Sequence, residues 1–434
     1  MLRFPSQVLF FRVAAVVALI PLVVISARSA SYKVLFNFNR TSGEPSSGLV
    51  VDSQGNAYGT TFLGGHNNAG SVYELSPTAG YHLLYPFSLT GPGGENPQGN
   101  LVFDSGGNLY GTTVNGGISN SNCLPSASCG VVFKLSPPTS NGDPWTETVL
   151  YDFCSQSNCT DGFNPESGVI FDSQGNLYGT AYQGGDCSHC GVVFELSPPS
   201  GGVGLWTETV LYNFCSQANC VDGKMPYGGL IFDSAGNLYG TTTMGGAAGT
   251  VFRLSPTNNG WVETVLHNFE VGSGDGVLPY GGLAFDGAGN LYGTTTAGGN
   301  TSDCFESGCG VVFELTPTIG GGWTETILHT FNGSDGAAPY AGVVLDSANN
   351  LYGTTRNGGN GPPNCGEDYC GTVFKLTTKN NGQWSIGVFR FPEELTGSNP
   401  EASVTLDSAG NVYGTTAFGG TGKGSGVVFR ITQP

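Results

Sequence analysis

The chain has 434 residues, of which 72 are glycine and only 11% are charged, and its formal net charge is −18 at pH 7. This acidic excess disfavours nucleic acid and anionic membrane surfaces as partners, because both carry negative charge. Cations, neutral glycans and other proteins remain as partner classes. The length exceeds that of a usual single domain, but a β-propeller reaches it as one unit.

The first 30 residues have the composition of a targeting segment. Arg3 and Arg12 precede the apolar run Val13–Ile25, and small residues follow at the positions that a signal peptidase recognises. This order predicts a secretory signal peptide in residues 1–30. The alternative is an uncleaved N-terminal anchor, because further apolar residues stand before Arg12.

Residues 31–434 are expected to form one domain that is secreted, extracellular or periplasmic. No second apolar stretch of membrane-spanning length follows residue 30. We expect a monomer that has no membrane contact beyond the alternative N-terminal anchor.

A tandem repeat occupies this whole domain. A variant of Asp-Ser-x-Gly-Asn-Leu-Tyr-Gly-Thr-Thr occurs seven times at intervals of 52 to 68 residues. A unit of this size, repeated this often, is typical of radial or linear repeat architectures. The first residues of the seven copies are Asp52, Asp104, Asp172, Asp233, Asp286, Asp346 and Asp407.

Each repeat unit contains four short β-type segments. In the fourth unit these are 228–232, 238–242, 249–254 and 261–266. Asp, Asn and Gly between the first two predict a tight hairpin turn, and alternating polar and apolar residues mark the fourth as a strand with one wet face. Four strands in each of seven units predict an all-β fold, the seven-bladed β-propeller with four antiparallel strands per blade.

The two ends of the domain complement each other. Residues 32–38 look like a fourth strand that lacks its first three, and residues 427–431 look like a third strand without a fourth. We expect the N-terminal strand to complete the last blade beside the C-terminal strand. The ring is then closed and leaves no open sheet edge.

The 12 cysteines fall into six pairs of near neighbours. An even count in close pairs predicts local disulfides in an exported protein. The alternative is metal binding, because the segment with Cys187, His189 and Cys190 has the spacing of metal ligands. A zinc site would need two more ligands nearby. The pairs are Cys123/Cys129, Cys154/Cys159, Cys187/Cys190, Cys215/Cys220, Cys304/Cys309 and Cys365/Cys370.

The motif Gly-Asn-Leu-Tyr-Gly-Thr-Thr-x-x-Gly-Gly, followed by Gly-x-Val-Phe-x-Leu, resembles the repeat of the GloVer-type tandem-repeat proteins of exported bacterial chains. The resemblance covers all seven units. It implies no established chemistry. Proteins of this type often carry a C-terminal sorting anchor, and we expect none in this sequence. A weaker likeness of the turn to NHL-like and gluconolactonase-like propellers carries no catalytic residue across.

Differences between the copies point to one face of the ring. All six cysteine pairs fall in second-to-third loops or in crossings between blades, which share a face opposite the Asp turns. A proline precedes each turn Asp by seven residues. Because it occurs in all seven units, we expect it to have a structural role, which is to fix φ where the chain enters the inner strand. In some units Asp-Gly precedes this proline, and in three a tyrosine follows it. We expect these residues near the mouth of the central channel: Asp161, Asp222, Asp275, Asp335, Tyr227, Tyr280 and Tyr340.

Such a cluster would stack a sugar ring and bind its hydroxyl groups, or hold a hard cation such as Ca²⁺ through oxygen ligands. The structural alternative is that Asp-Gly is turn chemistry and that tyrosine packs beside proline. No other cofactor is indicated. The sequence therefore favours an exported, non-catalytic binding or interaction scaffold for a glycan or a protein at the disulfide-bearing face.

The second hypothesis is a secreted carbohydrate-active hydrolase or lyase that uses acidic residues at the channel mouth. No catalytic residue stands out. His267 and His329 take the fourth-strand position that tyrosine fills elsewhere, so we expect them on the strand surface. The repeated glutamates of the fourth strands are expected to be solvated: Glu147, Glu208, Glu263 and Glu325.

Overall fold

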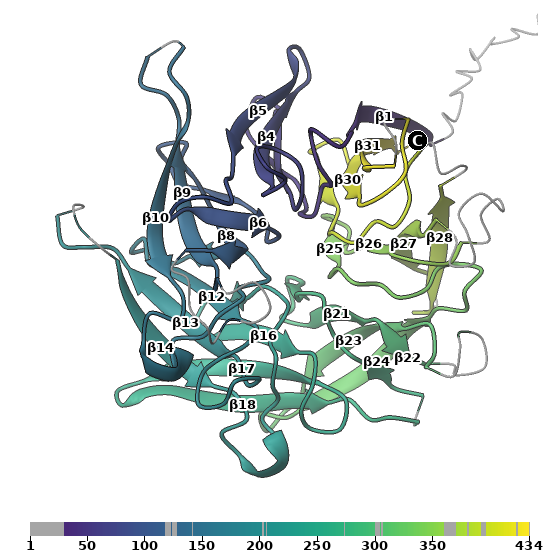
Figure 1. Cartoon of the computed structure of the whole chain (residues 1–434). Helices are drawn as coiled ribbons and strands as arrows, with labels where there is room; N and C mark the ends of the chain where they lie inside the picture. Colours follow the sequence, from purple (N-terminus) through teal and green to yellow (C-terminus); the bar gives the residue numbers. More distant parts are fainter. Residues whose placement is uncertain are drawn as a thin grey trace, which may run out of the picture.

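The computed structural model is a ring of seven blades around a central channel (Figure 1). Each blade is an antiparallel sheet whose shortest strand lies nearest the channel. The structure describes residues 30–433 except 118–122, 124–127, 141, 202, 203, 205, 273, 300–303, 305, 306, 360–369, 380, 381, 392–395, 422 and 423. The predicted signal peptide therefore lies outside the described residues.

The first four blades follow one another along the chain. Blade 1 contains β2 (Val50–Val51), β3 (Ala57–Thr61), β4 (Ser71–Ser76) and β5 (Gly80–Pro86). Blade 2 contains β7 (Val102–Phe103), β8 (Leu109–Gly116), β9 (Val131–Ser136) and β10 (Thr146–Asp152), with β6 (Gly94–Pro97) added to β8. Blade 3 contains β11 (Ile170–Phe171), β12 (Leu177–Ala181), β13 (Val192–Ser197) and β14 (Thr207–Asn213). Blade 4 contains β15 (Ile231–Phe232), β16 (Leu238–Thr242), β17 (Thr250–Thr257) and β18 (Gly260–Asn268).

The remaining three blades repeat this order. Blade 5 contains β20 (Ala284–Phe285), β21 (Leu291–Thr295), β23 (Val311–Pro317) and β24 (Trp323–Thr330), beside the small pair β19 (Gly276–Val277) and β22 (Ala297–Gly298). Blade 6 contains β25 (Val344–Leu345), β26 (Leu351–Thr355), β27 (Thr372–Thr378) and β28 (Trp384–Arg390). Blade 7 contains β29 (Thr405–Leu406), β30 (Val412–Thr416), β31 (Val427–Thr432) and β1 (Ser31–Asn37).

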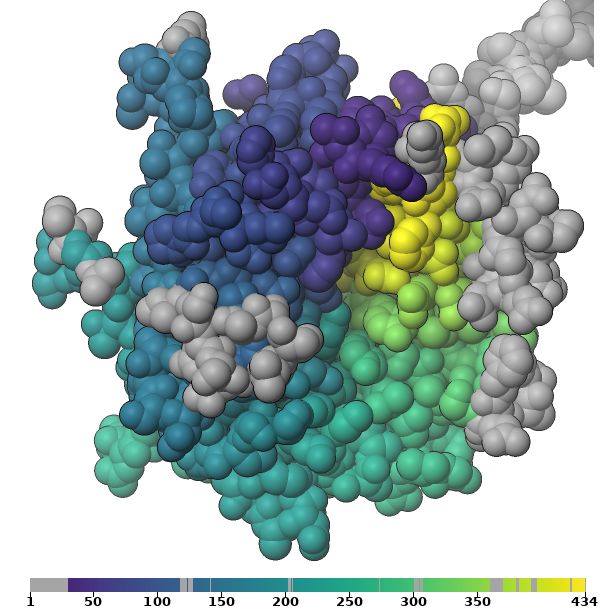
Figure 2. Space-filling view, in the orientation of Figure 1, coloured from purple at the N-terminus to yellow at the C-terminus, as the bar shows by residue number. Residues whose placement is uncertain are grey.

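Blade 7 confirms the predicted closure. Its outer strand β1 comes from the start of the domain and pairs antiparallel with β31, from Ser31 opposite Thr432 to Asn37 opposite Val427. In the space-filling view the purple N-terminal and yellow C-terminal segments are in contact (Figure 2). The ring is thus held shut by a strand that is remote in sequence.

The Asp-Ser-x-Gly-Asn motif builds the turn from the first strand to the second. In blade 4, Asp233 Oδ1 accepts hydrogen bonds from the backbone N–H groups of Ala235 (2.8 Å) and Asn237 (2.9 Å). Its Oδ2 accepts from Asn237 Nδ2 (2.6 Å) and from the hydroxyl of Tyr239 (3.0 Å). Burial raises the pKa of Asp233, but these hydrogen bonds outweigh it and hold the pKa below its usual value. The motif therefore has a structural role in the turn, as expected.

Aromatic pairs join each blade to the next. A buried ring just after the fourth strand meets, edge to face, a ring in the third strand of the following blade, with centroids 4.9 to 5.4 Å apart. Such pairs contribute about 0.5–1.5 kcal/mol beyond the burial of their area. The seven pairs are Phe38–Tyr73, Phe87–Phe133, Phe153–Phe194, Phe214–Phe252, Phe269–Phe313, Phe331–Phe374 and Phe391–Phe429.

Hydrogen bonds repeat at the same boundaries, closer to the channel. In blades 2 to 7 the first threonine after Tyr-Gly donates to a backbone carbonyl of the next blade, as Thr241 does to Gly281 (3.0 Å) and Thr415 to Ser47 (3.0 Å). Two short 3₁₀ turns, Ser157–Cys159 and Ala218–Cys220, lie in crossings between blades. Within the described residues, no helix has the length and apolar character needed to cross a membrane.

Candidate functional site at the channel mouth

The residue directly after each conserved proline faces the central channel. All seven of these residues line one cavity of about 420 Å³. In every blade the chain at or just before the proline pairs with the end of the second strand or the segment after it, as Pro45 does with Thr61 and Lys224 with Met244. The position after the proline therefore recurs at the same height. In blade order the seven residues are Ser46, Gln98, Glu166, Tyr227, Tyr280, Tyr340 and Glu401.

Three of the seven form an aromatic side of the cavity. The ring centroids of Tyr227 and Tyr280 lie 4.9 Å apart, and those of Tyr280 and Tyr340 lie 5.1 Å apart. All three side chains are half-buried. Gln98 Nε2, which comes from blade 2, donates a hydrogen bond to the hydroxyl of Tyr227 in blade 4. The predicted tyrosine cluster is therefore present and lies at the channel.

Carboxylates form the opposite, polar side. Burial raises the pKa of Glu166 to about 7, so a proton is exchanged there close to neutral pH. Burial also raises the pKa of Glu401, although Arg356 counteracts the rise through an ion pair of 2.8 Å. The Arg356 guanidinium also lies over the ring of Tyr340, 5.2 Å from its centroid. The cavity thus has one aromatic wall and one wall of hydrogen-bonding groups.

The cavity opens on the face that carries the disulfides. Its wall includes Phe62, Arg356 and Phe418, which follow second strands and so belong to second-to-third loops, where several of the cystines also lie. The Asp turns lie at the other ends of the same strands. The bonded pairs are Cys123–Cys129, Cys154–Cys159, Cys187–Cys190, Cys215–Cys220 and Cys304–Cys309.

Cys187 and Cys190 are joined to each other, so the alternative of a metal site with His189 is wrong. Cys370 is also disulfide-bonded, while its predicted partner Cys365 lies outside the described residues. The structure therefore supports local disulfides at this face.

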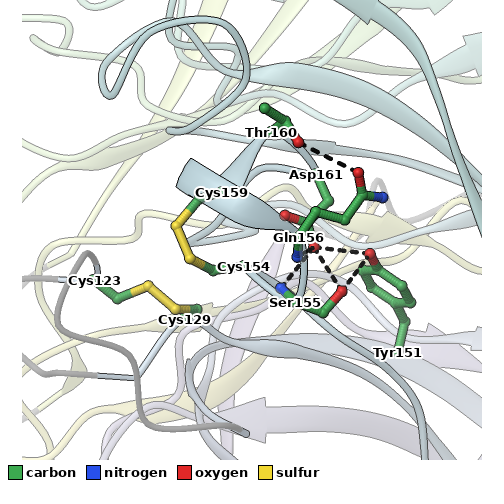
Figure 3. The surroundings of a disulfide bond; sticks show 9 residues. All are labelled: Cys123, Cys129, Tyr151, Cys154, Ser155, Gln156, Cys159, Thr160 and Asp161. Carbon is green, nitrogen blue, oxygen red and sulfur yellow. Dashed lines mark hydrogen bonds between the residues drawn. A yellow bond between two sulfur atoms is a disulfide. The ribbon is translucent and has the colours of Figure 1, made fainter.

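The four predicted aspartates do not share the cavity with the tyrosines. In the crossing between blades 2 and 3, Asp161 Oδ2 accepts hydrogen bonds from the Tyr151 hydroxyl (2.8 Å) and from the Ser155 N–H (2.8 Å) and hydroxyl (2.9 Å), beside the Cys154–Cys159 disulfide (Figure 3). Asp161 is 0% exposed. Its Oδ2 is satisfied within the protein, whereas Oδ1 is buried without a hydrogen-bond partner among the described residues.

The other three aspartates have the same role at later boundaries. Asp222 binds the hydroxyl of Tyr212 (2.9 Å), Asp275 faces His267 Nε2 (3.3 Å), and Asp335 faces His329 Nε2 (2.9 Å). None of the four lines the channel cavity. The structure therefore does not bring the four aspartates together with the tyrosines in one cavity, because each aspartate is held at a different blade boundary.

We expect Asp222→Ala to lower the free energy of unfolding by about 2–3 kcal/mol, because the half-buried hydroxyl of Tyr212 and the N–H of Ser216 lose a charged acceptor that is itself 0% exposed. Ligand binding at the channel should be unchanged. Chemical denaturation checks the first expectation. Equal stability of the variant and the native chain would contradict the structural role assigned to this carboxylate.

The strand histidines and glutamates are also placed differently from the prediction. Instead of lying on strand surfaces, His267 and His329 are half-buried between blades, with side-chain exposures of 20% and 18%. The glutamates are not solvated, because each inserts between its own fourth strand and the preceding blade. Burial raises the pKa of Glu208 to about 8 and the pKa of Glu263 and Glu325 to about 7.

Sequence reasoning missed Glu166, Gln98 and Glu401 in the channel. The signal was available, because these residues occupy the same position after proline as the three tyrosines. Comparing all seven copies at that one position would have found them. The Asp-Gly dipeptides attracted attention instead, although Asp-Gly is common in turns.

Comparisons with known proteins were made by sequence, by shape and by family. No curated protein matches the sequence. In shape the chain is similar to a crystal structure of glucose dehydrogenase (12% identity, TM-score 0.45, covering 92% of this chain and 99% of that one). It is similarly related to the soluble aldose sugar dehydrogenase from Escherichia coli in the apo-form (10% identity, TM-score 0.46, covering 94% and 100%).

The model of one repeat family matches almost the whole chain, over residues 22–217, 125–305 and 300–434. The matched ranges span all seven blades, from β1 to β31. This chain therefore belongs to the Gloeobacter/Verrucomicrobia repeat family.

Proposed function

We propose that this protein is an exported binding propeller that holds a sugar unit of a glycan at the mouth of its central channel. The observation that carries the proposal is the seven-membered ring of residues after the conserved prolines. Three consecutive blades supply tyrosine there, and the other four supply hydroxyl, amide or carboxylate groups.

The division of the cavity into two walls suits a sugar. A pyranose has an apolar face of C–H groups, which packs on aromatic rings, and an equator of hydroxyl groups, which need donors and acceptors. Tyr280 and its neighbours would supply the aromatic rings, and Gln98, Glu166 and Glu401 would supply the hydrogen-bond donors and acceptors. A volume of about 420 Å³ falls within the range of small-molecule sites and has room for one or two sugar residues.

Export is supported by the disulfides. Five cystines stand within the described residues, and such bonds persist mainly in oxidising compartments. They brace loops and crossings on the face where the cavity opens. A rigid face of this kind is what an extracellular glycan-binding surface needs, because a preorganised site loses less entropy when it binds.

The test is binding of the full-length, tag-free chain to a glycan array and to insoluble cellulose, chitin and xylan. Tyr280→Ser should lose about tenfold or more in affinity, because the central ring of the aromatic wall is removed. The variant should fold, because blade 1 carries Ser46 at the equivalent position. Glu166→Gln, which copies Gln98 of blade 2, should weaken binding in the same assay.

The matched control is Tyr58→Phe, which changes a tyrosine at the Asp turn on the opposite face. It should bind like the native chain. Binding that is equal in Tyr280→Ser and the native chain would exclude the channel mouth, and would move the search to a protein partner on the loops. Release of soluble oligosaccharide, lost in Glu166→Gln, would instead support the hydrolase or lyase hypothesis with Glu166 as its acid.

A further inference from the structure

A polar group recurs between the outer strands of neighbouring blades. It consists of a tyrosine or histidine from one fourth strand, an aspartate from the crossing, and a glutamate from the next fourth strand. We call it the interblade triad. Its members are Tyr151, Asp161 and Glu208 between blades 2 and 3; Tyr212, Asp222 and Glu263 between blades 3 and 4; and His267, Asp275 and Glu325 between blades 4 and 5.

The third triad differs from the others because it contains a histidine. His267 Nε2 lies 3.3 Å from Asp275 Oδ2 and 3.6 Å from Glu325 Oε2. Burial lowers the pKa of His267, but the hydrogen bond to Asp275 and the charge of Glu325 outweigh it, so the pKa lies above its usual value. One imidazole nitrogen and two carboxylate oxygens therefore converge from β18, the crossing and β24.

These distances suit a shared metal ion. Donors that each lie about 2.0–2.2 Å from an ion in tetrahedral or octahedral geometry are about 3–3.6 Å apart. All three donor atoms lie within 4.8 Å of one another. The other carboxylate oxygen, Glu325 Oε1, is buried and has no hydrogen-bond partner in the described part of the chain. It is available as an additional ligand or as an acceptor for a metal-bound water.

The triad also has an entrance. His267, Asp275 and Glu325 line an open pocket of about 490 Å³ together with Asn268, Glu270 and others. An ion can enter from solvent, and room is left for water to complete the coordination. The excess of acidic residues in the whole chain favours the approach of a cation.

We infer that His267, Asp275 and Glu325 form a site for a divalent transition-metal ion, with Zn²⁺ as the best match to one imidazole and two carboxylates. Neighbouring boundaries lack this donor set. Tyrosine replaces histidine between blades 2 and 3 and between blades 3 and 4. Between blades 5 and 6, His329 and Asp335 are present, but Ile386 pairs with Leu376 where Glu325 pairs with Leu315.

The site would brace a crossing that has no disulfide. The crossings that hold Asp161 and Asp222 each contain a cystine, Cys154–Cys159 and Cys215–Cys220. The crossing that holds Asp275 has no cysteine, since none occurs between Cys220 and Cys304. An ion bound to β18, this crossing and β24 would tie blades 4 and 5 together, and binding to the folded state alone raises stability by mass action.

The test uses the full-length, tag-free chain with its disulfides intact, after treatment with a chelator and desalting. Zn²⁺ is added, unbound metal is removed by gel filtration, and the metal content per chain is measured by mass spectrometry. The native chain should retain one Zn²⁺, and its melting temperature should rise with added Zn²⁺. Glu325→Gln should retain less metal under the same conditions.

The decisive variant is His267→Tyr. It places at this boundary the tyrosine that blades 2 and 3 carry at the same strand position, so it should fold and still hydrogen-bond Asp275 while losing the bound Zn²⁺ and the thermal shift. The matched control His329→Tyr changes the histidine whose boundary lacks the glutamate, and should retain the metal. Failure of the native chain to retain Zn²⁺, or equal retention by His267→Tyr, would overturn the inference.

Discussion

Replacement of Phe214 by alanine is expected to lower the free energy of unfolding by about 3–5 kcal/mol, the range measured for buried phenylalanines. Phe214 is 0% exposed, and its ring meets Phe252 of the next blade edge to face, with centroids 4.9 Å apart. Alanine removes both the buried area and the contact between blades 3 and 4. Chemical denaturation followed by tryptophan fluorescence measures the loss.

Two further variants test whether the loss comes from the contact between blades or from a general sensitivity of the propeller to truncated phenylalanines. Phe418→Ala truncates a phenylalanine that is 41% exposed, and should cost about 0.5 kcal/mol or less. Phe38→Ala removes the equivalent contact with Tyr73 where the ring closes, and should also make β1 accessible to protease. Equal stabilities of Phe214→Ala and Phe418→Ala would show that the aromatic pairs do not hold the blades together.

The second large effect is a loss of stability as the pH rises from about 4 to about 8. Burial, and then the charge of Asp161, raise the pKa of Glu208 to about 8, and burial, followed by the charge of Asp222, raises that of Glu263 to about 7. In the unfolded chain both lie near 4.3. The folded state therefore holds these protons more tightly, so the stability that they contribute is complete below pH ~4 and is lost as the pH rises through the folded values.

Between pH 6 and pH 9 the free energy of unfolding should fall by about 1–2 kcal/mol for each carboxylate, after allowance for solvent screening. Glu208→Gln mimics the protonated form and should flatten this part of the profile. Asp143→Asn, which neutralises an exposed carboxylate, is the control and should leave the profile unchanged. If the free energy of unfolding of Glu208→Gln fell between pH 6 and pH 9 by as much as that of the native chain, groups other than Glu208 would be responsible for the pH dependence.

The fold was predictable from the sequence because its rules are local and repeated. The Asp turn satisfies itself with atoms no more than six residues away, as Asp233 does with Asn237 and Tyr239. The closing strand was also predictable. Residues 32–38 look like a fourth strand that lacks its first three, and residues 427–431 look like a third strand that lacks a fourth. Close cysteine pairs form bonds within one loop, and this explains why the five described pairs were correct.

The candidate site was predictable in part. Proline fixes the residue after it at one height, so Tyr227, Tyr280 and Tyr340 came together at the channel as expected. Asp222 is only a few residues from Tyr227 along the chain, yet it is held at the outer boundary by Tyr212 and Ser216. Sequence proximity gave no information on this separation, because it depends on how the crossing folds back over the fourth strand.

By itself, the sequence determined the number of blades, the order of strands, the place of closure and the face that carries the disulfides. Each of these depends on residues within one repeat, or on the count of repeats. Only the tertiary structure decided which groups meet across a blade boundary, because contacts such as Phe214 with Phe252 or His267 with Glu325 join different repeats. Burial between blades also decided that Glu208 and Glu325, which looked solvated, carry raised pKa values, since desolvation depends on what the neighbouring blade excludes.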